Sequence, residues 1–342
     1  MPLRKFICPD KEEIEISKCL AESGCRMCNR CAARPVLKVM AASDREWKGN
    51  PSTTQLIKGT QEAFLAITQE YATSPDRMAF MILGSSGHYI LEKQGDDISQ
   101  AELDLGGGTG SIRPDSLECE GGTNILIDYK TSGSYVVAKA LGIFFEEVPT
   151  VDPITEQLVL YKTGPRKGKP RTHKERRIDP KLADVRDWAL QLNNYRMRLE
   201  KECVKGPDGK FYRKDENPPK DSSKFKVNRI KAQVIVRDGN TMMALSRGID
   251  RNIYLIDIPR IPDEQVKEYF KRKTDDLLQA LKQGYWSTPC NDIERWEGKK
   301  CQEYCPVNKF CAYWIETYSK NIDVEDQAGA DTEQIGEDGC PL

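Results

Sequence analysis

Twelve cysteines, gathered mainly near the two ends of the 342-residue chain, constrain this fold more than any other feature of the sequence. Five lie in the first 31 residues and four lie between positions 290 and 311. The opening stretch MPLRKFICPDKEEIEISKC lacks the apolar run of a secretion signal, so we expect a cytoplasmic protein. Thiols in a reducing compartment are more often metal or cluster ligands than disulfides. The sequence therefore predicts metal-bound thiolates near both ends, while Cys119, Cys203 and Cys340 stand alone.

Composition narrows the class of protein. Charged residues make up 31% of the chain, which is typical of a soluble globular protein. No apolar run approaches the roughly 18 residues that cross a bilayer, so we expect no contact with a membrane. The net charge of −1 gives no general attraction to nucleic acid. Any binding to DNA must therefore come from local basic stretches.

The first third of the chain predicts helices behind a Cys-rich segment. Residues 1–33 are too short and polar to hold together without a metal. Apolar residues at helical spacing then predict three helices, over 34–46, over 51–71 behind hydroxyl caps, and over 76–95. The last of these carries His88, one of only two histidines in the chain.

After this helix the hydrophobic period changes. Two strands, over 111–118 and 123–131, are separated by the turn residues CEGG. The remaining expected elements are a short helix near Ala138, a hairpin over 156–179, a helix over 180–203, a mobile loop over 206–224, a strand over 230–240 and a helix over 263–284. This order predicts an α/β core with a mixed central sheet flanked by helices. The acidic tail over 321–342 is expected to be disordered.

The strand pair carries a candidate catalytic set. Asp115 follows Pro114 on the first strand, and Asp128 and Lys130 share a face of the second because strand side chains alternate. Paired carboxylates hold hard cations such as Mg²⁺, which polarise a phosphate and lower the pKa of bound water. A lysine can stabilise the negative charge that develops. An isolated Asp-x-Lys is usually only a charged strand end, but His88 precedes these strands and Gln191 and Tyr195 follow them, four apart on one helix.

These motifs together resemble a known family. GSSGHYILE, a strand that ends in Pro-Asp, IDYKT and Gln-x-x-x-Tyr are similar to the RecB-type branch of the PD-(D/E)xK nuclease superfamily. The resemblance covers about residues 50 to 315 and implies a restriction-endonuclease-like core within a nuclease domain over 34–320. It also implies that His88, Asp115 and Asp128 bind the metal ion, that Lys130 is the catalytic lysine, and that Gln191 and Tyr195 face the site. The connection between IDYKT and QLNNY is longer than in simpler members.

The activity that the resemblance implies is hydrolysis of DNA phosphodiester bonds with Mg²⁺ or Mn²⁺. We expect an exonuclease that acts on single strands or DNA ends, in recombination, repair or phage DNA processing. Its partner is then DNA, with unidentified recombination or replication proteins. The alternative is a catalytically silent DNA-binding or scaffold module that retains the fold. A zinc-binding regulatory protein would leave the IDYKT strand unexplained.

The resemblance also assigns four of the cysteines. Iron–sulfur exonucleases of this branch, of the CRISPR adaptation, AddB and phage types, bind a [4Fe–4S] cluster with one upstream and three downstream cysteines. Cys31 resembles the first, and Cys301, Cys305 and Cys311 resemble the trio, although the first downstream spacing is one residue longer than usual. Zinc or free thiols are the alternatives, because thiolates alone do not separate the metals. Cys290 could instead complete a self-contained C-terminal site.

Two further assignments stay open. If Cys31 serves the cluster, four thiolates remain for a structural zinc ion, those of Cys8, Cys19, Cys25 and Cys28; the alternative is a reduced, flexible terminus. The stretch PRKGKPRTHKERR is either a solvated hairpin face or a contact with the DNA backbone. Its basic residues are Arg166, Lys167, Lys169, Arg171, Lys174, Arg176 and Arg177.

Overall fold

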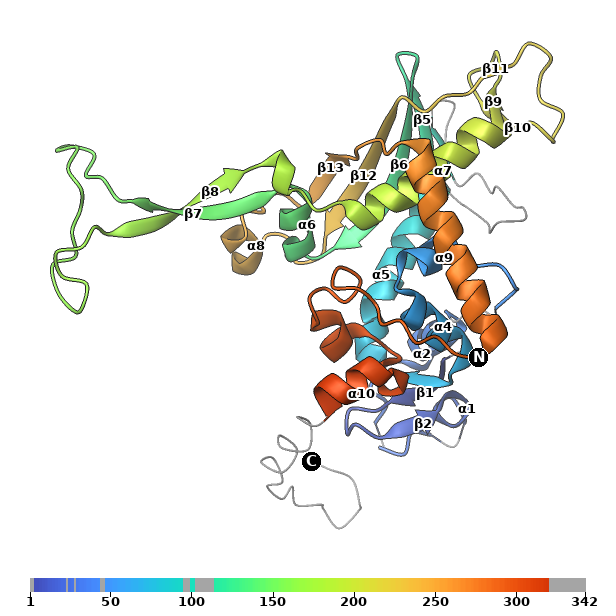
Figure 1. The fold of residues 1–342 in the computed structure, drawn as a ribbon, viewed down its shortest axis with the longest axis horizontal. Helices are drawn as coiled ribbons and strands as arrows, with labels where there is room; N and C mark the ends of the chain where they lie inside the picture. Colours follow the sequence, from blue (N-terminus) through green and yellow to red (C-terminus); the bar gives the residue numbers. More distant parts are fainter. Residues whose placement is uncertain are drawn as a thin grey trace.

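The protein has a mixed α/β fold with several β-sheets flanked by helices (Figure 1). The computed structural model describes residues 3–22, 24–27, 29–43, 47–94, 99–101 and 114–319. Cys28 and the acidic tail predicted over 321–342 lie outside the described residues. Within them, no helix is both long enough and apolar enough to cross a membrane.

The largest sheet carries the two strands that were predicted to hold the catalytic residues. Its order is β13-β12-β6-β5-β4, and only β6 and β12 run parallel to each other. The strands are β4 Ser99–Ala101, β5 Ser116–Glu120, β6 Thr123–Ser132, β12 Arg229–Val236 and β13 Ile253–Asp257. The strands predicted over 123–131 and 230–240 are confirmed as β6 and β12. The mixed sheet predicted from the sequence is also confirmed.

A tight turn fixes the register of β5 and β6. Gly121 and Gly122 both have positive φ, 53° and 79°, a conformation that glycine adopts without steric cost. Two residues with positive φ between antiparallel strands match the right-handed twist of a hairpin. The turn pairs Ser116 with Ile127, so the start of β5 lies beside the segment of β6 that contains Asp128.

Helix α7 (Arg186–Glu202) covers this sheet. It buries Leu192 and Leu199 in the same hydrophobic core as Leu117 of β5 and Leu126 of β6. This element confirms most of the helix predicted over 180–203, which is preceded by a 3₁₀ turn at Pro180–Leu182. Helix α9 (Asp263–Gln283) contacts α7 and leads the chain to the C-terminal cysteines.

The single helix predicted over 51–71 is wrong, because the structure divides it into α3 (Thr53–Ile57) and α4 (Thr60–Thr68). The break falls at Lys58 and Gly59, which both have extended backbone. A Cβ atom at Gly59 would lie 2.2 Å from Cys290 Sγ. The break therefore lets the C-terminal cysteine loop approach the first turn of α4.

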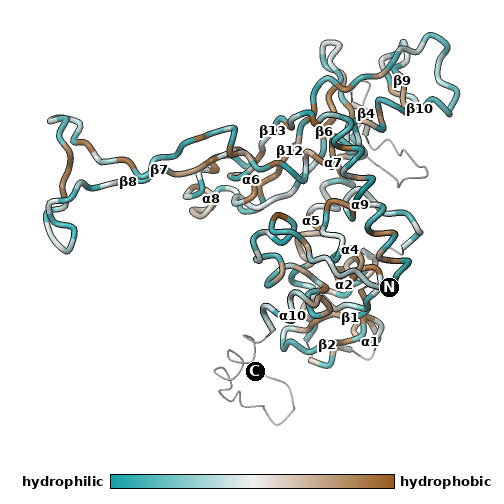
Figure 2. Tube along the Cα trace, in the orientation of Figure 1, coloured by the Kyte–Doolittle hydropathy of each residue, from teal (hydrophilic) through white to brown (hydrophobic). Residues whose placement is uncertain are grey.

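The sequence suggested a polar N-terminal segment that needs a metal to hold it together. In the structure this segment instead packs against later parts of the chain. Strand β1 (Leu3–Ile7) pairs with β2 (Glu13–Glu15) and, in parallel, with β3 (Tyr71–Thr73). Leu3 and Phe6 are buried with Leu37 and Met40 of α2 (Arg34–Ala42). The short helix α1 (Ile16–Cys19) and the long helix α5 (Pro75–Glu92) complete this lobe, whose apolar stretches are brown in Figure 2.

A two-stranded ribbon projects away from the body (Figure 1). Strand β7 (Ile143–Pro149) follows α6 (Ser134–Ala140) and pairs with β8 (Thr172–Ile178) along its whole length. The hairpin predicted over 156–179 therefore has the wrong first strand. Its second strand corresponds to β8, but β8 pairs with β7, which lies before residue 156. Isolated bridges join Val151 to Leu158 and Leu160 to Pro170 beyond β7 and β8.

Small elements account for the rest of the described chain. Most of the stretch predicted as a loop over 206–224 lies outside helices and strands, apart from two short strands, β10 Phe211–Arg213 and β11 Ser223–Lys224, which both pair with β9 (Cys203–Lys205) just before it. Helix α8 (Met242–Ser246) lies between β12 and β13. The C-terminal segment winds through turns at Lys300–Tyr304 and Asn308–Phe310 into α10 (Ala312–Tyr318).

Candidate functional site

Four elements bring the six predicted catalytic residues together at the central sheet. Asp115 immediately precedes β5, and Asp128 and Lys130 lie on β6. Helix α5 contributes His88, and α7 contributes Gln191 and Tyr195. Both helices contact β6, which explains how motifs separated by more than 100 positions in sequence meet at one place.

Asp115 is held on two sides. Its Oδ1 lies 3.1 Å from His88 Nδ1, and its Oδ2 accepts a hydrogen bond of 2.6 Å from the backbone N–H of Tyr129. The Asp115 side chain is only 10% exposed. The hydrogen bond from β6 thus fixes the carboxylate at the start of β5, beside the face that carries Asp128.

Lys130 and Gln191 connect β6 with α7. Lys130 Nζ lies 2.5 Å from Asp128 Oδ2 and donates a hydrogen bond of 3.0 Å to Gln191 Oε1. Gln191 Nε2 in turn lies 3.0 Å from the Tyr195 hydroxyl and 3.5 Å from Asp128 Oδ1. The helix therefore orients the lysine, as expected for residues four apart on one helix face.

Burial controls the protonation of this network. Loss of hydration raises the pKa of Asp128 to about 6, with a further upward contribution from Asp115 and an opposing one from Lys130. The hydrogen bond to Asp115 raises the pKa of His88. Burial raises the pKa of Tyr195 to about 12, so its hydroxyl keeps its proton at neutral pH. The site is a buried pair of carboxyl groups with one lysine beside it.

The chemistry of these donors fits a hard divalent cation. Asp128 Oδ2 is buried, and its close contact is with the Lys130 ammonium group at 2.5 Å. Two buried carboxylates beside an imidazole are a ligand set that Mg²⁺ and Mn²⁺ accept. No group of three or more His, Cys, Asp or Glu side chains in the described part of the chain forms a ready-made metal site, which neither supports nor excludes the expected cofactors.

Four cysteines line one small cavity in the C-terminal segment: Cys290, Cys301, Cys305 and Cys311. Burial raises the pKa of Cys290 to about 11 and that of Cys305 to about 12, and it also raises that of Cys301. Thiols whose pKa is raised bind a metal only after they lose their protons, so metal binding would release protons here. Thiols are ligands of both iron–sulfur clusters and zinc, although these four belong to no group of three or more side chains already placed to hold a metal ion in the described part of the chain.

Helix α4 closes this cavity on one side. Cys290 Sγ accepts a hydrogen bond from the backbone N–H of Glu62, in the first turn of the helix. Lys300 Nζ lies 2.5 Å from Glu62 Oε2, and Lys273 Nζ lies 2.9 Å from Glu294 Oε1, with all four side chains largely buried. These two ion pairs hold the cysteine loop against α4 and α9.

Cys31 lies with the other N-terminal cysteines rather than with the C-terminal trio. It lines a separate small cavity together with Cys8, Cys19 and Cys25. Charges on Cys8 and Cys25 contribute to the raised pKa of Cys31, after burial, which is the larger cause. The partnership of Cys31 with Cys301, Cys305 and Cys311 is therefore not the arrangement in this structure. The fourth thiol that lines the C-terminal cavity is Cys290, which the sequence had left open as an alternative.

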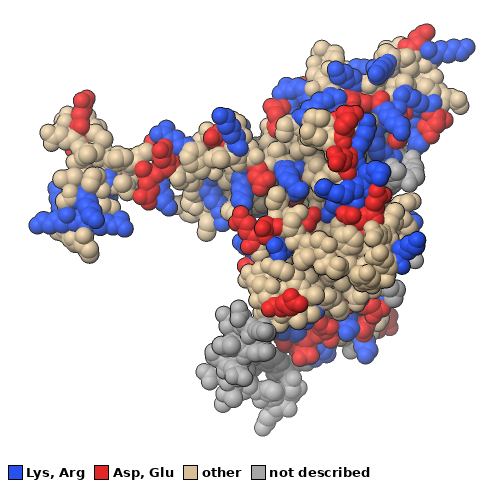
Figure 3. Space-filling model, viewed as in Figure 1, with Lys and Arg blue, Asp and Glu red and all other residues tan. Residues whose placement is uncertain are grey.

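The predicted basic residues do not form one patch. Arg166, Lys167, Lys169 and Arg171 lie in the end of the ribbon, beyond β7 and β8, where Lys and Arg gather in Figure 3. Lys174, Arg176 and Arg177 lie on β8, nearer the body. Arg177 pairs with Glu146 and Glu175 at 3.2 and 3.0 Å, so its charge is partly compensated.

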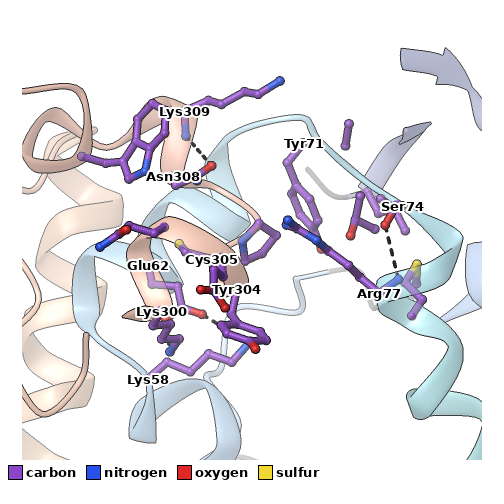
Figure 4. Close-up of a pocket in the computed structure, with 18 of the residues that line it drawn as sticks. Lys58, Glu62, Tyr71, Ser74, Arg77, Lys300, Tyr304, Cys305, Asn308 and Lys309 are labelled. Atoms are coloured by element: carbon purple, nitrogen blue, oxygen red, sulfur yellow. Dashed lines mark hydrogen bonds and ion pairs between the residues drawn. The ribbon is translucent and has the colours of Figure 1, made fainter. Parts of the chain in front are cut away.

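A cavity of about 1190 Å³ lies elsewhere (Figure 4). It separates the N-terminal sheet and α5 from the C-terminal turns, and side chains such as Tyr71, Arg77, Lys300 and Tyr304 line it. None of the six catalytic residues is among the residues that line it. Its acidic and basic side chains are mixed, and we assign no chemistry to it.

Comparison with known proteins adds little to this geometry. No family model and no curated protein matches the chain. One solved structure, the crystal structure of SSO0001, is 14% identical over 81% of this chain and 94% of that chain, with a TM-score of 0.35. A likeness at this level carries no argument about fold or function.

Proposed function

We propose that this protein is a Mg²⁺- or Mn²⁺-dependent deoxyribonuclease of the RecB-type branch of the PD-(D/E)xK superfamily, acting in the cytoplasm. The observation that carries the proposal is the meeting of His88, Asp115, Asp128 and Lys130 at one point, with Gln191 and Tyr195 behind the lysine.

The connectivity of the sheet supports a restriction-endonuclease-like core. Strands β4, β5 and β6 are consecutive antiparallel neighbours, and after α7 the chain returns to pair β12 in parallel with β6. This order leaves Asp115 and Asp128 on adjacent strands. A parallel return across a helix also places α7 over the strand that carries Lys130.

Each residue has a distinct role in this proposal. Asp115, Asp128 and His88 would hold the cation, which supplies charge neutralisation and an activated water when it is bound. Lys130 presents its ammonium group to the phosphate and stabilises negative charge on it. Gln191 keeps Lys130 in position, and Tyr195 holds Gln191 without changing protonation.

The alternative is a silent DNA-binding or scaffold module. Burial of both carboxylates argues against this alternative. Burying two poorly hydrated acid groups lowers the stability of the fold, and a module that only binds DNA has no use for such a pair. A nuclease needs such a pair in order to hold its cation.

The metal requirement gives the first prediction. Purified protein should degrade linear single-stranded DNA with Mg²⁺ or Mn²⁺ and should stop when EDTA is added, because the cation neutralises the phosphate in the reaction. Gel analysis of end-labelled linear DNA and of circular single-stranded DNA measures this. An exonuclease leaves the circle intact. Undiminished cleavage in EDTA would rule out the proposed reaction.

The ribbon gives a second prediction, since its position suits contact with a DNA backbone. Replacing Arg166, Lys167, Lys169 and Arg171 by glutamate should weaken DNA binding and flatten its dependence on salt, because fewer counterions are released. Charge reversal at Lys174, Arg176 and Arg177 should weaken DNA binding less, because the Arg177 charge is already paired with Glu146 and Glu175. Fluorescence anisotropy across a salt series measures both. Unchanged affinity of the first variant at low salt would make the ribbon a solvated surface.

A further inference from the structure

Two exposed aromatic rings beside the candidate active site lie among four cationic side chains. The Arg237 guanidinium lies 3.9 Å from the ring centre of Phe80. The ring of Tyr135 has Lys139, Arg247 and Lys299 at 5.2, 5.7 and 6.0 Å from its centre. Phe80 is 54% exposed and Tyr135 is 53% exposed. These six residues are called the ring–cation surface below.

The ring–cation surface begins where the catalytic strand ends. The backbone N–H of Arg237 donates to the carbonyl of Ser132, the last residue of β6. Ser132 is two positions beyond Lys130, a distance of roughly 7 Å along a strand. Strands β6 and β12 therefore end together, at Ser132 and Val236, and the surface continues from the candidate metal site.

Asp238 joins the two halves of the surface. Its carboxylate accepts hydrogen bonds of 2.6 Å from both the backbone N–H and the hydroxyl of Ser134, the residue before Tyr135. Arg247 also donates to the Ser134 hydroxyl, at 2.9 Å, and lies 3.6 Å from Asp238. These contacts fix the turn after β12 against the start of α6, so the position of Arg237 relative to Tyr135 is set before any ligand binds.

Helix α5 leaves the approach to His88 open. Gly84 and Gly87 lie between Phe80 and His88 on this helix, and a Cβ atom at either glycine would meet nothing within 4 Å. A chain that lies along α5 could therefore pass from the Phe80 ring to the candidate metal ligands without meeting side chains at these positions.

We propose that the ring–cation surface binds unpaired bases and adjacent phosphates of a single DNA strand next to the bond that is cleaved. This inference rests on the proposed nuclease function and names its substrate as single-stranded. Exposed aromatic rings stack with bases of any identity, while nearby cations contact the phosphates, which is the usual chemistry of sequence-independent single-strand binding. Paired bases are already stacked within a duplex and do not offer a free face to such rings.

The test separates base stacking from attraction to phosphate. The full-length protein is titrated in EDTA with fluorescent oligo(dT) and with a strand of equal length whose sugars carry no bases. The original protein should prefer oligo(dT). The double variant Phe80→Leu/Tyr135→Leu should lose about tenfold in affinity for oligo(dT) and bind both strands equally, because stacking is lost and the phosphate contacts remain. Arg237→Gln should lower the affinity for oligo(dT) and for the strand without bases to a similar extent.

Tyr89 provides a matched control on the same helix. It is 59% exposed, and Lys93 lies 4.1 Å from its ring centre, so the pair resembles that of Phe80 and Arg237. Nine positions of α-helix turn it roughly 180° away from Phe80. Tyr89→Leu should leave the preference for oligo(dT) unchanged. If the double variant also keeps this preference, the proposed surface is overturned.

A small diester separates this inference from the nuclease proposal itself. Hydrolysis of bis(p-nitrophenyl) phosphate with Mn²⁺ requires the metal site but no stacked bases. The double variant should hydrolyse it as fast as the original protein, and a loss of this activity as well would mean that the surface supports the metal site rather than the strand. If the original protein cleaves neither single-stranded DNA nor the small diester but still prefers oligo(dT) over the strand without bases, the nuclease proposal is wrong. The proposal that the surface binds a single strand is then still supported.

Discussion

Asp128→Asn should abolish metal-dependent DNA cleavage and yet leave the metal-free protein more stable than the original at neutral pH. The substitution keeps the shape of a side chain that is 3% exposed but removes its charge. A bound cation contributes several kcal/mol to the reaction, and its loss lowers the rate more than about a hundredfold. Lys130→Ala should be similarly inactive, because Asp128 and Gln191 position no other ammonium group among the described residues.

The stability gain follows from the pKa of Asp128. Its value in the folded protein is about 6, above the ordinary value of 3.8, so the folded state holds this proton more tightly than the unfolded state. Stability from this group is therefore complete below about pH 4 and is lost as the pH rises through 6, a cost of about 3 kcal/mol at neutral pH. Asparagine has no such cost, so the variant should melt several degrees higher at pH 8 but not at pH 4.

Thermal unfolding with and without Mn²⁺ completes this test. The cation binds only the folded site, so it should raise the Tm of the original protein but not that of Asp128→Asn. Asp221→Asn, at an exposed position, is the control and should change neither cleavage nor the shift caused by metal. A variant that still cleaves DNA, or that still gains stability from Mn²⁺, would show that Asp128 is not a ligand.

Local sequence patterns could predict the elements of the site because each is long or strongly marked. Helix α5 is 18 residues long, and β6 is rich in β-branched residues and directly follows the turn at Gly121 and Gly122. The contacts among the elements could not be predicted in this way. The hydrogen bond between Lys130 and Gln191 joins residues 61 positions apart, and it depends on how α7 crosses the sheet.

Short elements and long-range pairings explain the failures. Strand β1 has five residues, and its partner β3 lies beyond residue 70, so no local pattern shows that Leu3 and Phe6 are buried. The prediction of the hairpin over 156–179 was wrong for a related reason. The basic run of β8 has no apolar alternation to identify β7 as its partner. The ring–cation surface combines residues from α5, α6, the turn after β12, the end of α8 and the C-terminal segment, and no local pattern marks any of them.

The cysteines distinguish two architectures that the sequence left open. A cluster bound by Cys31 and the C-terminal trio would cross-link nearly the whole chain, whereas a cluster bound by Cys290 closes only a loop of about 20 residues. The structure favours the second, because Cys290 shares a cavity with the trio and Cys31 shares a different one. We propose that a cluster bound in this cavity would stabilise mainly the C-terminal segment and its contacts with α4.

Protein purified without oxygen should therefore contain iron, and Cys290→Ala should lose it as completely as Cys301→Ala, Cys305→Ala or Cys311→Ala. The reason is that each variant removes one of four ligands from the same cavity. Without the cluster, the C-terminal segment should be cut readily in limited proteolysis, since buried thiols of raised pKa then have no cation to pair with. Cys31→Ala should keep its iron. In this variant only the N-terminal lobe should become more sensitive to proteolysis, and any zinc bound there should be lost. Cys203→Ala, which removes a buried thiol far from either cavity in sequence, is the control and should keep all its iron. Iron analysis, visible absorption and proteolysis of the six variants decide between the architectures. Loss of iron from Cys31→Ala, with iron retained in Cys290→Ala, would restore the cross-link between the two ends of the chain, and the local cluster would be wrong.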